Sequence, residues 1–152
     1  MGLREAHEAM KGRLAVVVGG CAGHLGRGVT LGLAREGARI IACDNDRDGL
    51  ETIVGEVEAL GGTIAPIYGD VMDPASLDAF WDEVERLTDR IDILVNVPGG
   101  VARMLFENTS RASHEHDIRL AVRHRHRWLR WLARSGFARS RPHPCPPPSA
   151  RW

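Results

Sequence analysis

A glycine-rich segment after an apolar run is the first feature of this sequence that could do chemistry. It reads Gly19-Gly20-Cys21-Ala22-Gly23-His24-Leu25-Gly26 and precedes a helical pattern that reaches about Glu36. Glycine lets bare backbone approach a pyrophosphate, and the N-terminus of a following helix offers unpaired N–H groups with a partial positive charge. The segment therefore predicts a dinucleotide site at Gly20, Gly23, His24, Leu25 and Gly26. A tight turn without a ligand is the alternative.

An acidic residue follows at the distance that such a site requires. Asp44 ends the next apolar run, 18 residues after Gly26. A carboxylate there can accept hydrogen bonds from both ribose hydroxyls of an adenosine. The alternative is that Asp44 is a turn residue or a helix cap. Because the two features occur together, we interpret Asp44 as a ribose-binding residue.

These residues need a scaffold in which strands and helices alternate. Apolar runs at 14–18, 39–43, 63–68 and 91–96 predict four strands, and the segments between them carry apolar residues at helical spacing. Right-handed crossovers then predict an α/β fold with a parallel, doubly wound sheet. The apolar stripes expected to face the sheet are Leu50, Ile53, Val54, Val57 and Leu60 on the second helix, and Leu77, Phe80, Trp81, Val84 and Leu87 on the third.

Capping residues mark where these helices begin and end. Asn45 or Asp46 can cap the second helix, and Asp73, with Pro74 after it, the third. Gly37 closes the first helix. The segment from Ser113 to Leu120 is expected to be the beginning of a fourth helix.

Three motifs, in this order, resemble those of the short-chain dehydrogenase/reductase family between about Gly12 and Leu120. The family's Thr-Gly-x-x-x-Gly-x-Gly loop falls without gaps on residues 19–26. Gly69-Asp70-Val71 is similar to the family's Asp-Val pair, and Asp92-Ile93-Leu94-Val95-Asn96-Val97-Pro98-Gly99 to its Asp-x-Leu-Val-Asn-Asn-Ala-Gly stretch. The resemblance implies a Rossmann-type fold that binds a nicotinamide dinucleotide, with Asp70, Val71, Asn96, Pro98 and Gly99 among the cofactor-binding residues.

Departures from the family pattern bear on the cofactor. Gly19 replaces the family's threonine, so the side-chain hydrogen bond from that threonine to the strand-four turn is expected to be lost. His24 replaces the middle glycine. Either Gly23 provides the close approach of the backbone to the pyrophosphate instead, or cofactor binding is weakened. Gly23 itself stands where a basic residue would select NADP. Together with Asp44, this favours NAD, because Asp44 would repel a 2′-phosphate and nothing basic would receive it.

The proton-transfer residues that the resemblance implies are missing. In the family a tyrosine, with a lysine four residues later, exchanges a proton with the substrate, helped by a serine and an asparagine. The only tyrosine here is Tyr68 and the only lysine is Lys11, and Ala121 stands where the asparagine is expected. We therefore expect the cofactor-binding half of an oxidoreductase that acts on an alcohol or ketone, inactive by itself. A non-catalytic nucleotide-binding or interaction module with a nucleic-acid-binding tail is the alternative.

The charge is divided between two parts of the chain. Residues 1–120 hold all 20 acidic residues and 12 Lys and Arg residues, whereas residues 121–152 hold eight Arg and no acid. We interpret 1–120 as an incomplete Rossmann domain and 121–152 as a disordered basic tail, either natural or read out of frame after residue 120. Nucleic-acid binding by the tail and metal binding by His114, His116, His124 and His126 are the less favoured interpretations.

Other partners and the location follow from the rest of the composition. No apolar run is long enough for a membrane span, residues 1–12 lack the core of a signal peptide, and Cys21 and Cys43 lie beside apolar runs as reduced thiols would. A cytoplasmic protein is expected. A truncation after strand four would leave that strand as an apolar edge, which predicts self-association.

Overall fold

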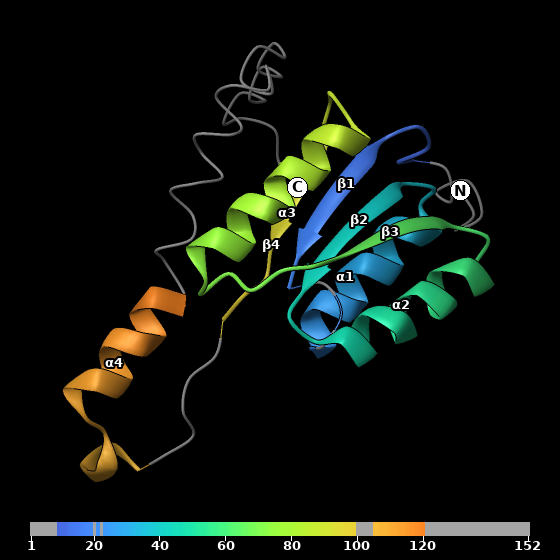
Figure 1. The fold of residues 1–152 in the computed structure, drawn as a ribbon. Helices are drawn as coiled ribbons and strands as arrows, with labels where there is room; N and C mark the ends of the chain where they lie inside the picture. Colours follow the sequence, from blue (N-terminus) through green and yellow to red (C-terminus); the bar gives the residue numbers. More distant parts are fainter. Residues whose placement is uncertain (1–8, 20, 22, 100–104, 121–152) are drawn as a thin grey trace, which may run out of the picture.

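The computed structural model describes residues 9–19, 21, 23–99 and 105–120 (Figure 1). The predictions for Gly20, for Ala121 and for the whole segment 121–152, with its disorder, its histidines and its basic charge, lie outside the described residues. In chain order the elements are β1 (Leu14–Val18), α1 (His24–Arg35), β2 (Arg39–Asp44), α2 (Arg47–Ala59), β3 (Thr63–Tyr68), α3 (Pro74–Leu87), β4 (Ile93–Asn96), the 3₁₀ helix η1 (Phe106–Asn108) and α4 (Arg111–Ile118).

The four strands form one parallel sheet in the order β3-β2-β1-β4, so the predicted α/β doubly wound fold is confirmed. β1 is central, with Val16 opposite Ile41 of β2 and Leu94 of β4. Because the chain moves outward from β1 to β3 and then crosses back to β4, the strand order reverses between β1 and β4. In open α/β sheets, ligands bind in the crevice outside the carboxyl ends of the strands at this point.

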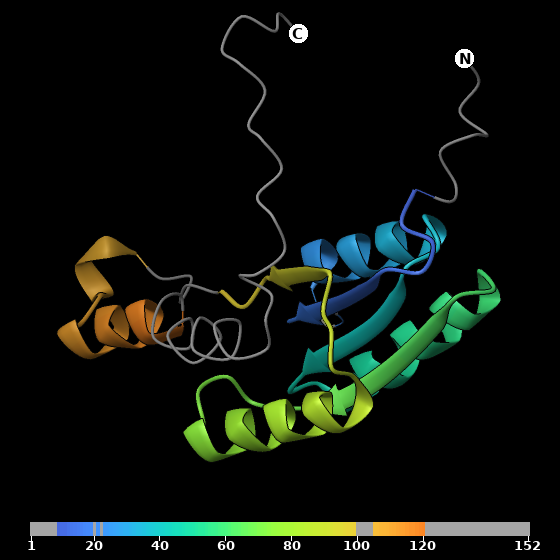
Figure 2. The same cartoon turned by 90° about the horizontal axis from the view of Figure 1, so that it is seen from above.

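Helices cover both faces of the sheet, with α1 and α2 on one side and α3 on the other (Figure 2). Alternate strand residues face opposite sides. Val16, Val18 and Cys43 therefore pack with the α3 stripe, and Ala15, Val17 and Ala42 pack with α1 and α2. All five residues of β1 are buried, which explains the uninterrupted apolar run in the sequence.

The predicted caps lie at the ends of the helices. The Asp46 side chain accepts a hydrogen bond from the Gly49 amide at 3.0 Å, so Asp46, and not Asn45, caps α2. Asp73 accepts from the amides of Ala75 and Ser76 and caps α3. Gly37 follows α1 with a φ of +86°, in the left-handed region.

Both helical stripes are buried except at Val54, which is half-buried, and at their last members. Leu60 is 43% exposed and Leu87 is 50% exposed, so these two predictions of burial are wrong. Leu60 is the C-cap of α2 and Leu87 the last residue of α3. Each stands at the end of its helix, where it is not covered by the sheet.

The fourth strand begins at Ile93, two residues later than predicted, because Asp92 replaces a ladder partner with its side chain. Its carboxylate accepts the Leu14 amide at 3.0 Å and Nη1 of Arg13 at 3.1 Å, and it also pairs with Arg90. Burial would raise the pKa of Asp92, but these three donors hold it below its usual value. The hydrogen bonds of Asp92 to Leu14 and Arg13 thereby connect the start of β4 to the start of β1.

The fourth helix begins earlier than predicted, and none of its residues is buried. Ser110 caps α4 by accepting the Ser113 amide at 3.1 Å, and Ser113 Oγ accepts the Ser110 amide in return. No residue of α4 is buried, and the helix lies apart from the sheet in both views. In the part of the chain that the structure describes, no helix is long and apolar enough to cross a membrane.

Candidate functional site

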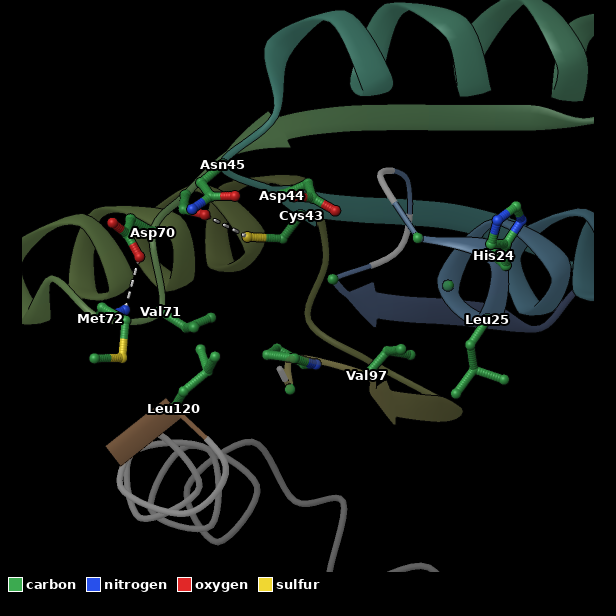
Figure 3. A pocket seen from close by; sticks show the side chains of 16 residues that line it. His24, Leu25, Cys43, Asp44, Asn45, Asp70, Val71, Met72, Val97 and Leu120 are labelled. Atoms are coloured by element: carbon green, nitrogen blue, oxygen red, sulfur yellow. Dashed lines mark hydrogen bonds between the residues drawn. The ribbon is translucent and has the colours of Figure 1, made fainter. Parts of the chain in front are cut away.

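A cleft of about 540 Å³ opens at the carboxyl ends of the strands, where the strand order reverses. Segments that follow all four strands line it, together with the end of the α4 segment (Figure 3). The lining residues are Gly19, Gly23, His24, Leu25, Gly26, Cys43, Asp44, Asn45, Gly69, Asp70, Val71, Met72, Val97, Pro98, Gly99 and Leu120. The structure thus brings together nine of the sequence-predicted residues in one cleft, while Gly20 is not described and Asn96 is not in the lining.

The first turn of α1 presents its backbone to this cleft. Gly23 is the N-cap, in extended conformation, and no side chain caps this helix. A Cβ added at Gly23 would meet no atom within 4 Å, so the backbone there is open to a ligand. His24 and Leu25 are exposed at the same helix end, away from Asp70 and Met72 (Figure 3). The first amides of a helix have no partner within the helix, and together with the positive end of the helix dipole they suit an anion.

Asp44 lies at the end of β2 and is only 8% exposed. Its Oδ2 accepts the amide of Cys21 at 3.2 Å, and its Oδ1 accepts the amide of Asp46 at 3.2 Å. One carboxylate therefore joins the glycine-rich turn to the β2–α2 turn.

The segment after β3 forms the other end of the cleft. Asp70 Oδ1 accepts the Met72 amide at 2.8 Å, and the Asp70 amide donates to Ser76 Oγ at 2.9 Å, which fixes this carboxylate at the start of the turn. Beside it, the Cys43 thiol faces the carbonyl of Gly69 at 3.8 Å. Burial, with the charges of Asp44 and Asp70, raises the pKa of Cys43 to about 12. The thiol is therefore a neutral, inert part of the cleft floor.

Cys21 is the second buried thiol near the cleft. Burial is the largest cause that raises its pKa, and the Asp44 charge and hydrogen bond raise it further. Both described cysteines are free, as the sequence predicted.

The charge of the cleft is one-sided. Its described lining carries the carboxylates of Asp44 and Asp70 and no Lys or Arg. Arg47, three residues after Asp44, is not in the lining; its guanidinium lies 4.0 Å from the centre of the Tyr68 ring. Neither Tyr68 nor Lys11 lines the cleft either, so the arrangement offers binding groups without a tyrosine–lysine pair.

Comparison with known proteins agrees with this geometry. The family model described as short chain dehydrogenase matches residues 13–123. The chain belongs to the short chain dehydrogenase family. Proteins of this family are oxidoreductases with a Rossmann fold, and they bind nicotinamide cofactors.

Individual relatives match the same part of the chain. The 3-oxoacyl-[acyl-carrier-protein] reductase FabG of Thermotoga maritima is 33% identical over 59% of this chain and 36% of its own length. The 2,3-dihydro-2,3-dihydroxybenzoate dehydrogenase of Bacillus subtilis is 36% identical over 60% of this chain and 35% of its own. The solved Pseudomonas aeruginosa RhlG/NADP active-site complex superposes with a TM-score of 0.75 at 26% identity, covering 84% of this chain and 49% of that one. The chain thus spans about a third of these curated relatives.

Several lining residues were missed by the sequence interpretation. Asn45, Gly69, Met72 and Val97 each lie within two residues of a predicted one, at the same strand ends. Their positions just after predicted strands could have identified them, because the carboxyl ends of parallel strands meet at one edge of the sheet, where the cleft lies. Leu120 carried no such signal.

Proposed function

We propose that this chain is the nicotinamide-dinucleotide-binding half of a short-chain oxidoreductase, with a preference for NAD(H). The observation that carries the proposal is the cleft where the strand order reverses, with an uncapped helix N-terminus and the buried Asp44 on its walls. The bound nicotinamide would supply hydride chemistry. The substrate of the parent reaction would be a small alcohol or ketone.

Each wall of the cleft has a proposed part in binding. The backbone of Gly20, Gly23, His24, Leu25 and Gly26 would hold the pyrophosphate, and Asp44 the adenosine ribose. Asp70 and Val71 would bind the adenine ring, and Asn96, Pro98 and Gly99 the nicotinamide side. The 152 residues contain no Tyr-x-x-x-Lys, so hydride transfer with proton exchange would need groups from elsewhere.

Calorimetric titration of the 152-residue chain with NADH and with NADPH tests this function. We expect measurable binding of NADH and at least tenfold weaker binding of NADPH, because the described lining holds two carboxylates and no Lys or Arg to receive a 2′-phosphate. AMP and 2′-phospho-AMP, which carry the same difference without the nicotinamide, are the matched control pair. Equal affinities for NADH and NADPH would contradict the proposed role of Asp44 in selecting the coenzyme. If none of the four nucleotides binds, the proposed function is wrong.

A second proposal concerns self-association through β4, which is the edge strand next to β1 among the strands that the structure describes. Its four residues, Ile93–Asn96, are half-buried and uncharged, so the strand has none of the charges or prolines that guard natural edges. A second copy would pair with this edge through backbone hydrogen bonds.

The test is sedimentation velocity across a concentration series. We expect dimers or larger species at about 10 μM, and at least tenfold weaker association for Ile93→Lys, since a charge on the edge opposes pairing. Leu60→Lys is the control, an exposed apolar residue on α2. Thermal melts check that both variants fold. A monomer at every concentration, or an equal effect of both lysines, contradicts pairing through β4.

A further inference from the structure

The loop that follows β4 lies directly against the first residue of the glycine-rich turn. The Val97 amide donates to the Val18 carbonyl at 2.9 Å, which places the loop beside the end of β1. On its other side, the Gly19 amide donates to the Cys43 carbonyl at 2.7 Å. Gly19 is therefore held between β2 and the loop, at the point where the strand order reverses.

Two independent features disfavour a side chain at Gly19. Its φ is +71°, in the left-handed region that favours glycine. In addition, a Cβ at this position would lie 3.0 Å from Pro98 N, 3.2 Å from Pro98 Cδ and 3.3 Å from the Val97 carbonyl carbon. These atoms belong to the backbone or to a closed ring, so none of them can rotate out of the way. The space that a side chain would need is filled by Pro98.

We infer that Gly19 and Pro98 form a coupled positioning pair that seats the β4 loop on the glycine-rich turn and thereby sets the shape of the cleft between them. Both residues line the cleft. Pro98 is stiff in φ and has no N–H, so it holds its place by packing rather than by hydrogen bonding. The pair does the work for which the family resemblance implies a threonine side chain. Its effect on coenzyme rests on the proposed function, whereas its effect on the fold does not.

A double-mutant cycle measures the coupling. Gly19→Ala introduces both the φ strain and the contact with Pro98. Gly61→Ala is the matched control, because Gly61 has a φ of +73° and a Cβ there meets nothing within 4 Å. We expect Gly61→Ala to lower the folding equilibrium constant about fivefold and Gly19→Ala to lower it by a further tenfold. Adding Pro98→Ala removes Pro98 Cδ and the ring constraint on φ but leaves the backbone N of residue 98 and the Val97 carbonyl carbon, so it should recover part of the further loss in the Gly19→Ala background and none in the Gly61→Ala background.

Coenzyme binding distinguishes positioning from mere stability. At temperatures where each variant is folded, we expect Gly19→Ala to weaken NADH binding about tenfold and the double variant to recover part of that loss. If the effects of Gly19→Ala and Pro98→Ala on the free energy of unfolding are additive, the two residues are not coupled, whether or not coenzyme binds. Unchanged NADH affinity of folded Gly19→Ala overturns the positioning role. If Gly19→Ala alone does not fold, a folded double variant is the expected result and an unfolded one contradicts it. Absence of NADH binding by the unaltered chain would refute the proposed function and leave the unfolding cycle as the test of the pair.

Discussion

Replacement of Asp44 by alanine is expected to weaken NADH binding by about 10- to 100-fold and to remove most of the discrimination against NADPH. A hydrogen bond to a charged group contributes about 1.5–3 kcal/mol, and each 1.4 kcal/mol is a factor of ten in affinity. The ribose partner and the charge that repels a 2′-phosphate leave together. NADPH affinity should therefore stay constant or rise while NADH affinity falls.

The same substitution should also destabilise the walls of the cleft in the absence of coenzyme. Asp44 accepts the amides of Cys21 and Asp46, and in the alanine variant both lose this acceptor. An unsatisfied buried donor costs about 1–3 kcal/mol, so the glycine-rich turn should loosen and the melting temperature should fall. Hydrogen exchange at the Cys21 amide in the absence of coenzyme should become faster.

Two further variants separate these effects. Asp44→Asn keeps the shape and one acceptor oxygen but removes the charge, so it should lose discrimination while it keeps one of the two hydrogen bonds to the Cys21 and Asp46 amides. Asp48→Ala, in the first turn of α2 and exposed, is the control and should change neither. Calorimetric titration with both coenzymes and hydrogen exchange are the measurements. If Asp44→Ala retains the NADH preference of the unaltered chain, another residue selects the coenzyme.

The strands β1 and β2 and the helices α2 and α3 could be predicted from the sequence because the spacing of their apolar residues matches the faces that they bury. The runs at 14–18 and 40–43 are apolar without a break because helices cover both sides of those strands. Asp46, Asp73 and Gly37 then gave the helix ends through capping chemistry that depends only on local backbone. The common edge of parallel strands placed nine of the expected residues in one cleft.

What the sequence did not predict depends on contacts between segments far apart in the chain. The replacement of threonine by Gly19 was interpreted only as a lost hydrogen bond, because nothing local shows that Pro98 fills the space. Likewise the two-residue delay of β4 arises from Asp92, whose carboxylate takes the Leu14 amide from 78 residues away. Ser110 was a readable signal that was missed, since its side chain caps α4.

Phe80→Ala is expected to have the largest effect on stability, about 3–5 kcal/mol, which is most of the free energy of unfolding of a small domain. Phe80 is 1% exposed, at the centre of the stripe with which α3 covers the sheet, and its ring centre lies 4.8 Å from that of Trp81. Truncation would leave a cavity that β-branched strand residues cannot fill by rotating. With a urea slope of about 2 kcal/mol per M, the unfolding midpoint should fall by about 2 M.

The cavity should also reach the cleft, because Phe80 packs directly beneath its floor. A Cβ added at Gly69 would lie 3.5 Å from Phe80 Cβ and 2.8 Å from Cys43 Sγ, so these three residues are in close contact under the adenine end of the proposed site.

Phe80→Leu, which fills most of the space, should lose less than half as much stability. Leu87→Ala on the same helix is the control; its side chain is 50% exposed, and the change should cost less than about 1 kcal/mol. Urea unfolding and NADH titration of the folded variants are the measurements. Similar midpoints for Phe80→Ala and Leu87→Ala would mean that α3 does not carry the core on its side of the sheet, and an unchanged NADH affinity in folded Phe80→Ala would separate that core from the cleft.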